Sequence, residues 1–171
     1  MSSPVQSKVV LRVLGSLLSM FSITMLPPVV VGLIYGDGAI LPFILAFVTT
    51  LVTGLCLLYP VKDEKASLRL RDGFVVVVMF WTVLSVFGGL PFLLSPELDL
   101  SLAAAIFESV SGLTTTGATL IVGLDDLPHS ILFYRQQMQW LGGMGIIVLA
   151  IAILPMLGIG GMQLYLSLIH I

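Results

Sequence analysis

The sequence predicts an all-α integral membrane protein. Two N-terminal transmembrane helices precede two more, and a half-length helix separates the last pair. The 171 residues are 58% hydrophobic and 9% charged, with a mean hydropathy of +1.15, whereas an average soluble domain is about 25% charged. Charged residues separate uncharged stretches long enough to cross a bilayer, and one further apolar segment is too short to do so. The net charge of −2 gives no indication of a nucleic-acid partner.

Four segments are predicted to span the membrane. The first three are uncharged stretches of 24 residues each, at positions 13–36, 38–61 and 73–96, and a spanning helix needs about 20 apolar residues. Pro27 and Pro28 lie inside the first stretch and predict a kink, because proline lacks the backbone N–H that a helix requires. The fourth span is expected over residues 130–154.

A shorter apolar segment, residues 100–111, lies between the third and fourth spans, with Asp99 or Ser101 as its expected N-cap. As a helix it would measure about 18 Å, against about 30 Å for the hydrocarbon core. Non-helical backbone is tolerated at membrane depth only inside protein or along a water-filled path, and rows of backbone carbonyls form cation selectivity filters. The Thr-Thr-Thr-Gly sequence at 114–117 therefore indicates a re-entrant filter loop. An ordinary turn between two helices is the alternative.

Two charged residues flank this loop in otherwise apolar surroundings. Glu108 lies one turn before it, and a membrane-buried acid indicates a function with a partner. We expect Glu108 to support the loop, either by bonding to its backbone or by pairing with Arg135; a carboxylate near the outer interface is the alternative. Arg135 begins a polar stretch that also contains Gln136, Gln137 and Gln139, which favours a pore-facing or loop-bracing face over a simple interfacial anchor.

A second polar group contains Asp125, Asp126 and His129. Acids at the mouth of a pore could raise the local cation concentration, and with the histidine they could form a metal site. A solvated turn is the commoner arrangement for such residues.

Basic residues predict the orientation. Six of the seven lie before the first span or between the second and third: Lys8, Arg12, Lys62, Lys65, Arg69 and Arg71. Because cytoplasmic loops are rich in lysine and arginine, we expect the N-terminus and this loop to be cytoplasmic. The re-entrant loop would then enter from outside, and Arg135 is the exception.

Two segments carry a resemblance to a known family. Residues 107–117 read Phe-Glu-Ser-Val-Ser-Gly-Leu-Thr-Thr-Thr-Gly, and residues 127–165 include Leu-Pro-His-Ser-Ile-Leu-Phe-Tyr-Arg-Gln and Trp-Leu-Gly-Gly-Met-Gly-Ile-Ile-Val-Leu-Ala. From about Lys8 to Tyr165 the chain resembles the TrkH-type membrane subunits of the bacterial Trk potassium-uptake system, in the Trk/Ktr superfamily. That family's fold has four repeats of helix M1, pore helix and helix M2 around one pore, preceded by two extra helices.

The resemblance implies a division of this chain into parts. Residues 1–60 would form the two extra N-terminal transmembrane helices, and residues 61–72 a basic cytoplasmic loop. Residues 73–157 would form the first M1–pore helix–M2 repeat, and residues 158–165 would begin a cytoplasmic segment.

The resemblance also implies potassium uptake across the bacterial inner membrane, with K⁺ as the transported ion and neither an organic cofactor nor enzymatic activity. One quarter of the potassium selectivity filter would come from Thr114, Thr115, Thr116 and Gly117. Thr115 and Thr116 would bind potassium directly, and Glu108 and Arg135 would support the filter. The implied partners are a second full-length subunit, the cytosolic nucleotide-binding subunit TrkA and the lipid bilayer.

The chain differs from that family in length. Members of the family are about three times as long and contain four filter loops. Residues 166–171 read Leu-Ser-Leu-Ile-His-Ile, which a common transposon sequencing adapter encodes in frame. We therefore expect these residues to be an artefact and the chain to be an N-terminal fragment. The alternatives are a small homo-oligomeric cation channel, a non-conducting structural membrane subunit, and a membrane enzyme that uses Asp125, Asp126 and His129 with a metal.

Overall fold

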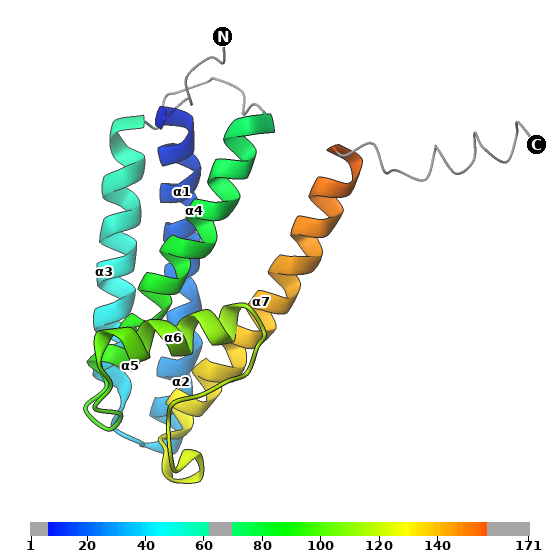
Figure 1. Ribbon diagram of the computed structural model, residues 1–171. Coiled ribbons are helices and arrows are strands. Elements are labelled where there is room, and N and C mark those ends of the chain that lie inside the picture. The colour runs from blue at the N-terminus through cyan, green and yellow to red at the C-terminus, as the bar shows by residue number, and fades with distance from the viewer. Residues whose placement is uncertain (1–6, 62–69, 157–171) are drawn as a thin grey trace, which may run out of the picture.

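The computed structural model describes residues 7–61 and 70–156, and all regular structure within them is helical. The α-helices, in chain order, are α1 Ser7–Ser22, α2 Leu26–Tyr35, α3 Ile40–Leu58, α4 Leu70–Gly88, α5 Leu90–Leu94, α6 Leu102–Leu113 and α7 His129–Met156. Helices α3 and α4 pack along α1, α6 lies across one end of this bundle, and α7 leans away from it (Figure 1). The all-helical fold predicted from the sequence is confirmed.

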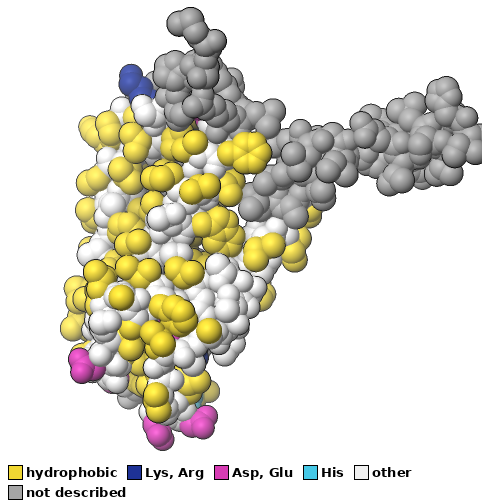
Figure 2. Space-filling model, in the orientation of Figure 1, with side chains coloured by type: hydrophobic (Ala, Val, Ile, Leu, Met, Phe, Trp, Pro, Cys, Tyr) yellow, Lys and Arg dark blue, Asp and Glu magenta, His cyan; other side chains and the backbone are white. Residues whose placement is uncertain are grey.

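Three helical stretches of the described residues are long and apolar enough to cross a membrane: Ser7–Tyr35, Ile40–Val61 and Asp72–Leu94. They match the first three predicted spans, and Figure 2 shows hydrophobic side chains over the flank of the bundle. The fourth predicted span corresponds to α7, His129–Met156, which is not among the three. Residues 62–69 of the predicted basic loop, and the predicted segments 158–165 and 166–171, lie outside the described residues.

The regular α-helix of the first span is interrupted near the two prolines. Helix α1 ends at Ser22, Ile23–Met25 form a 3₁₀ turn, and α2 carries Pro27 and Pro28 in its first turn. Proline is accepted there because the first N–H groups of a helix have no partner within the helix.

The third predicted span, residues 73–96, is not one continuous helix. Helix α4 ends at Gly88 and α5 begins at Leu90 with Pro91 in its first turn. A Cβ atom at Gly89 would lie only 3.0 Å from the Ala105 carbonyl oxygen of α6. The helix therefore breaks next to Pro91, at a point where the backbone of α6 passes close to it.

The short predicted helix is present as α6. It has 12 residues and begins at Leu102, with the Ser101 hydroxyl accepting a hydrogen bond from the Ala104 N–H at 3.3 Å. It begins and ends two residues later than predicted, and Ser101 rather than Asp99 is its N-cap. Its length, about 18 Å at 1.5 Å per residue, is well short of the roughly 30 Å bilayer core.

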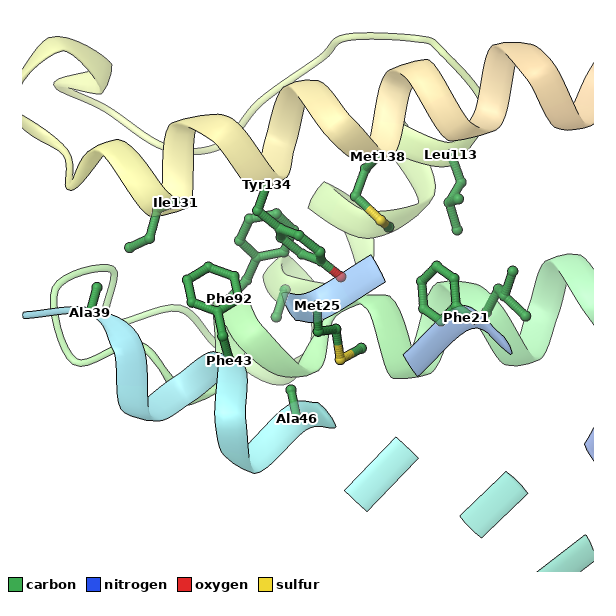
Figure 3. Close-up of a cluster of buried hydrophobic side chains, with 12 residues drawn as sticks. Phe21, Met25, Ala39, Phe43, Ala46, Phe92, Leu113, Ile131, Tyr134 and Met138 are labelled. Atoms are coloured by element: carbon green, nitrogen blue, oxygen red, sulfur yellow. The ribbon is translucent and has the colours of Figure 1, made fainter. Parts of the chain in front are cut away.

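The largest cluster of buried side chains lies where α6 and α7 meet the bundle (Figure 3). The rings of Phe43 in α3 and Phe92 in α5 lie 5.4 Å and 5.2 Å from the ring of Tyr134 in α7. The buried Tyr134 hydroxyl donates to the Gly88 carbonyl at 3.0 Å. Because burying one large apolar side chain stabilises a fold by about 1.5–3 kcal/mol, this cluster holds α7 firmly beside the loop that follows α6.

Candidate functional site

The loop after α6 is held by hydrogen bonds to the last turn of the helix. The Thr115 N–H donates to the Gly112 carbonyl at 2.9 Å, and the Thr116 N–H donates to the Ser111 carbonyl at 2.9 Å. This pair of bonds is the Schellman motif, which ends a helix with one residue in the left-handed conformation. Thr115 is that residue, with a φ of 58°.

Threonine is an unusual choice for this position. Glycine normally occupies it, because a Cβ atom crowds the left-handed backbone at a cost of about 1–2 kcal/mol. A β-branched residue there is a conformational outlier. Such strain persists where the surrounding structure imposes it, and it concentrates at functional sites. The conformation of Thr115 therefore marks this loop as a candidate site.

The threonine hydroxyls hold the loop together. Thr114 Oγ1 donates to the Val110 carbonyl at 2.8 Å and lies 2.8 Å from Thr116 Oγ1. Thr115 Oγ1 donates to the Thr114 carbonyl at 2.7 Å. These bonds fix the direction in which the peptide groups of the loop point.

The carbonyl oxygens of Thr115, Thr116 and Gly117 accept no hydrogen bond from any part of the chain that the structure describes. All three residues are exposed. They follow the C-terminus of α6, where the aligned peptide dipoles carry about half a negative charge. Backbone oxygens presented in this way suit a cation that sheds its water.

Glu108 fastens the far side of the loop. It is 4% exposed, and its Oε1 accepts hydrogen bonds from the Leu120 N–H at 2.6 Å and the Thr119 hydroxyl at 2.8 Å. Its Oε2 accepts a hydrogen bond from Arg135 Nε at 3.3 Å. The sequence left open whether Glu108 bonds the loop or pairs with Arg135, and the structure contains both contacts.

Arg135 brings α7 into the same network. Its residue exposure is 8%, so this ion pair is shielded from water on both sides. Removing one member of such a pair leaves an uncompensated buried charge and costs about 3–5 kcal/mol. The pair therefore fixes the distance between α6, α7 and the loop.

Helices α6 and α7 also touch through their backbones. A Cβ atom at Gly112 would lie 2.9 Å from Met138 Cβ, and one at Gly142 would collide with the carbonyl group of Leu113. Small residues allow membrane helices to approach this closely. The last carbonyl of α6 thus rests directly against α7.

The predicted polar group at residues 125–129 does not come together as one site. Asp125 and Asp126 are exposed in a 3₁₀ turn, Leu124–Asp126. The His129 ring instead stacks on Tyr35, with ring centroids 4.2 Å apart. Among the described residues, no three His, Cys, Asp or Glu side chains are grouped to hold a metal ion.

Asp37 is a contact residue that the sequence did not reveal. Its Oδ2 accepts a hydrogen bond at 2.8 Å from the Ser130 N–H in the first turn of α7. The two residues are far apart in the chain, and no pattern in the sequence connects them.

The fold and site together define a class: an integral membrane protein with a half-length helix that ends in an oxygen-rich loop. The family model of the TrkH cation transport proteins matches residues 40–170. The chain belongs to the TrkH family of cation transport proteins.

Individual relatives agree with this assignment. The chain is 57% identical over 94% of its length to the Trk system potassium uptake protein TrkH of Vibrio parahaemolyticus, and 56% identical over 92% to that of Escherichia coli K12. The crystal structure of the potassium transporter TrkH from Vibrio parahaemolyticus superposes with a TM-score of 0.86 at 56% identity, covering 91% of this chain and 33% of that one. The chain spans about one third of the length of these relatives.

Proposed function

We propose that this chain forms part of a potassium transporter of the bacterial inner membrane and supplies one quarter of its selectivity filter. The single observation that carries the proposal is the left-handed Thr115, which closes α6 and leaves the Thr115, Thr116 and Gly117 carbonyls without partners among the described residues. In this proposal Thr115 and Thr116 bind the ion directly and Thr114 and Gly117 complete the loop. The relatives' names as potassium uptake proteins support potassium as the ion.

The helices of the described residues support the proposed organisation. Residues 1–60 form two helices outside the pore unit, and residues 73–157 form M1 (α4 and α5), the pore helix (α6) and M2 (α7). Three further units from the remainder of a full-length chain would complete the ring. The basic loop at 61–72 faces the cytoplasm in this arrangement, and the filter loop enters from outside. Transport down the gradient then gains about 2.3 kcal/mol per charge for each 100 mV of membrane potential.

The proposed partners are a second full-length subunit and the cytosolic subunit TrkA. The relatives' names as proteins of the Trk system support the cytosolic subunit. Size-exclusion chromatography of the full-length protein, with and without TrkA, tests them: a dimer that co-elutes with TrkA is expected, and a monomer that TrkA leaves unshifted would reject both.

The filter assignment is tested by Gly117→Ser in a full-length protein that contains this segment. Gly117 and Gly123 share a φ of 74°, and neither has a steric neighbour closer than 3.8 Å at its Cβ position. Serine therefore imposes a similar backbone strain at both sites, about 1–2 kcal/mol, which makes Gly123→Ser a matched control. Only Gly117→Ser should lower the ratio of potassium to sodium flux in liposomes. An equal ratio in the two variants and the wild type would reject the filter assignment.

A further inference from the structure

The turn between α2 and α3 contacts the first turn of α7, and this contact lies outside the filter loop. We propose that Asp37 is a positioning residue of the filter: it anchors the N-terminus of α7, and through Arg135 and Glu108 it determines how firmly the filter loop is held. The inference rests on the proposed function. It assigns to the two N-terminal helices a part in ion selection.

Asp37 holds two segments at once. Its Oδ1 accepts a hydrogen bond from the Ala39 N–H at 3.2 Å within its own turn, and its Oδ2 accepts one from the Ser130 N–H at 2.8 Å. The first N–H groups of a helix lack intrahelical partners. The residue before α7 is Pro128, whose side chain has no atom that can accept a hydrogen bond. Asp37 therefore acts as the cap of α7 from a distant part of the chain.

The charge of Asp37 suits this position. An acidic group is stabilised at the N-terminus of a helix by the aligned peptide dipoles. The pKa of the Asp37 carboxyl lies below its usual value: burial raises it, but hydrogen bonds from Ser130 and Ala39 and the nearby His129 outweigh that effect. The carboxylate is thus the form that the folded structure favours.

A second contact keeps the two ends together. The Tyr35 ring at the end of α2 stacks on the His129 ring at the start of α7, at 4.2 Å and an interplanar angle of 4°. A Cβ atom at Gly32 would lie 3.1 Å from Asp37 Oδ1 and 3.5 Å from Ser130 Cβ. Helix α2, its turn and α7 thus form one compact contact.

The anchor reaches the filter loop through continuous contacts. Ser130 and Arg135 are separated by about 7.5 Å of one helix, and Arg135 Nε lies 3.3 Å from Glu108 Oε2. Glu108 Oε1 in turn accepts the Leu120 N–H at 2.6 Å. A shift of the first turn of α7 would move Arg135 and thereby loosen the loop. Energetic coupling between these residues is the quantity that the experiment measures.

The experiment uses a full-length protein containing this segment, reconstituted in liposomes, with the ratio of potassium to sodium flux as the readout. Asp37→Ala should lower the ratio about fivefold, the size of effect that loss of a helix cap has on an equilibrium. Asp37→Asn keeps an acceptor for the Ser130 N–H and should change the ratio less than about twofold. Glu97→Ala removes an exposed acid of a different loop and should leave the ratio unchanged.

The coupling is measured by placing Asp37→Ala in an Arg135→Gln background, where it should have little further effect because the connection to Glu108 is already lost. An undiminished effect in that background would overturn the inference. So would a lowered melting temperature in Asp37→Ala with the wild-type flux ratio, because it would show a purely structural role. If the alanine variant does not fold, Asp37→Asn tests the same contact, because asparagine still accepts the Ser130 N–H. A loss of selectivity in Asp37→Asn as large as that in Gly117→Ser would then overturn the inference.

Gly117→Ser, measured in the same assay, separates the two proposals. If it lowers the ratio and Asp37→Ala does not, only the positioning role fails. If Gly117→Ser leaves the ratio unchanged, the filter assignment fails, and the positioning role fails with it.

Discussion

Replacing Glu108 by alanine should damage both the stability and the selectivity of the protein. Glu108 is 4% exposed and its partner Arg135 is 8% exposed, so the variant leaves a buried guanidinium without its counter-charge. The expected loss is about 3–5 kcal/mol. The Leu120 N–H and the Thr119 hydroxyl also lose their acceptor, at about 1–3 kcal/mol for each group that stays unsatisfied.

Because these effects overlap, a double-mutant cycle is the cleaner measurement. Glu108→Gln keeps an oxygen for the loop and removes only the charge, and Arg135→Gln removes the opposite charge. Each single variant should be destabilised, and the double variant should lose about 1–3 kcal/mol less than the sum of the two. The free energy of unfolding is measured in detergent by denaturant titration of a full-length protein containing this segment. If the single effects add to within about 0.5 kcal/mol, the two residues are energetically independent and Arg135 does not contribute to the hold of Glu108 on the loop.

Three further predictions concern single positions. Gly142→Ala should destabilise the protein by about 1–3 kcal/mol, because the new methyl group collides with the Leu113 carbonyl. Gly143→Ala is the control and should be neutral or stabilising, since the nearest neighbour of its new methyl group is 3.7 Å away. The melting temperatures of the two variants test this difference. Thr115→Gly should raise the melting temperature by relieving about 1–2 kcal/mol of backbone strain while lowering the potassium-to-sodium flux ratio, and a lowered melting temperature would contradict the strain argument. The pKa of Asp37 is depressed below its ordinary value of 3.8, so its stabilising effect is present above that pH and is lost as the pH falls through the lower, folded value. Between about pH 5 and about pH 3 the wild type should therefore lose more stability than Asp37→Asn, and parallel pH profiles would refute this.

The sequence predicted the membrane-length helices well because charges mark their ends. The interruption just before Pro27 and Pro28 followed from proline chemistry, and the half-length helix followed from the short distance between Asp99 and the threonines. The break at Gly89 was missed although the third stretch contains its own signal, because Pro91 interrupts a helix for the same reason as Pro27 and Pro28. It coincides with the crossing of α6, which is a tertiary contact.

The sequence predicted which residues form the candidate site, but it did not predict the backbone conformation of the loop. Glu108 and Arg135 were chosen because buried charges need partners, and the structure shows them in contact. The left-handed conformation of Thr115 could not be predicted, because local propensity assigns that position to glycine. The contact of Asp37 with Ser130 joins residues 93 apart in sequence, and only the packing of α2 against α7 brings them together.

The backbone contact between Leu113 and Gly142 has a mechanical consequence. Side chains that separate two helices can change rotamer, and each change alters the spacing between the helices. The contact between the Leu113 carbonyl and Gly142 contains no side-chain torsion that could absorb a displacement of one helix against the other. A change of rotamer at this contact therefore cannot alter the spacing of α6 and α7. Several such loops assembled around one axis would present the same number of carbonyl oxygens at the same spacing in every molecule, and the number of coordinating carbonyls contributes to the choice between ions of one charge.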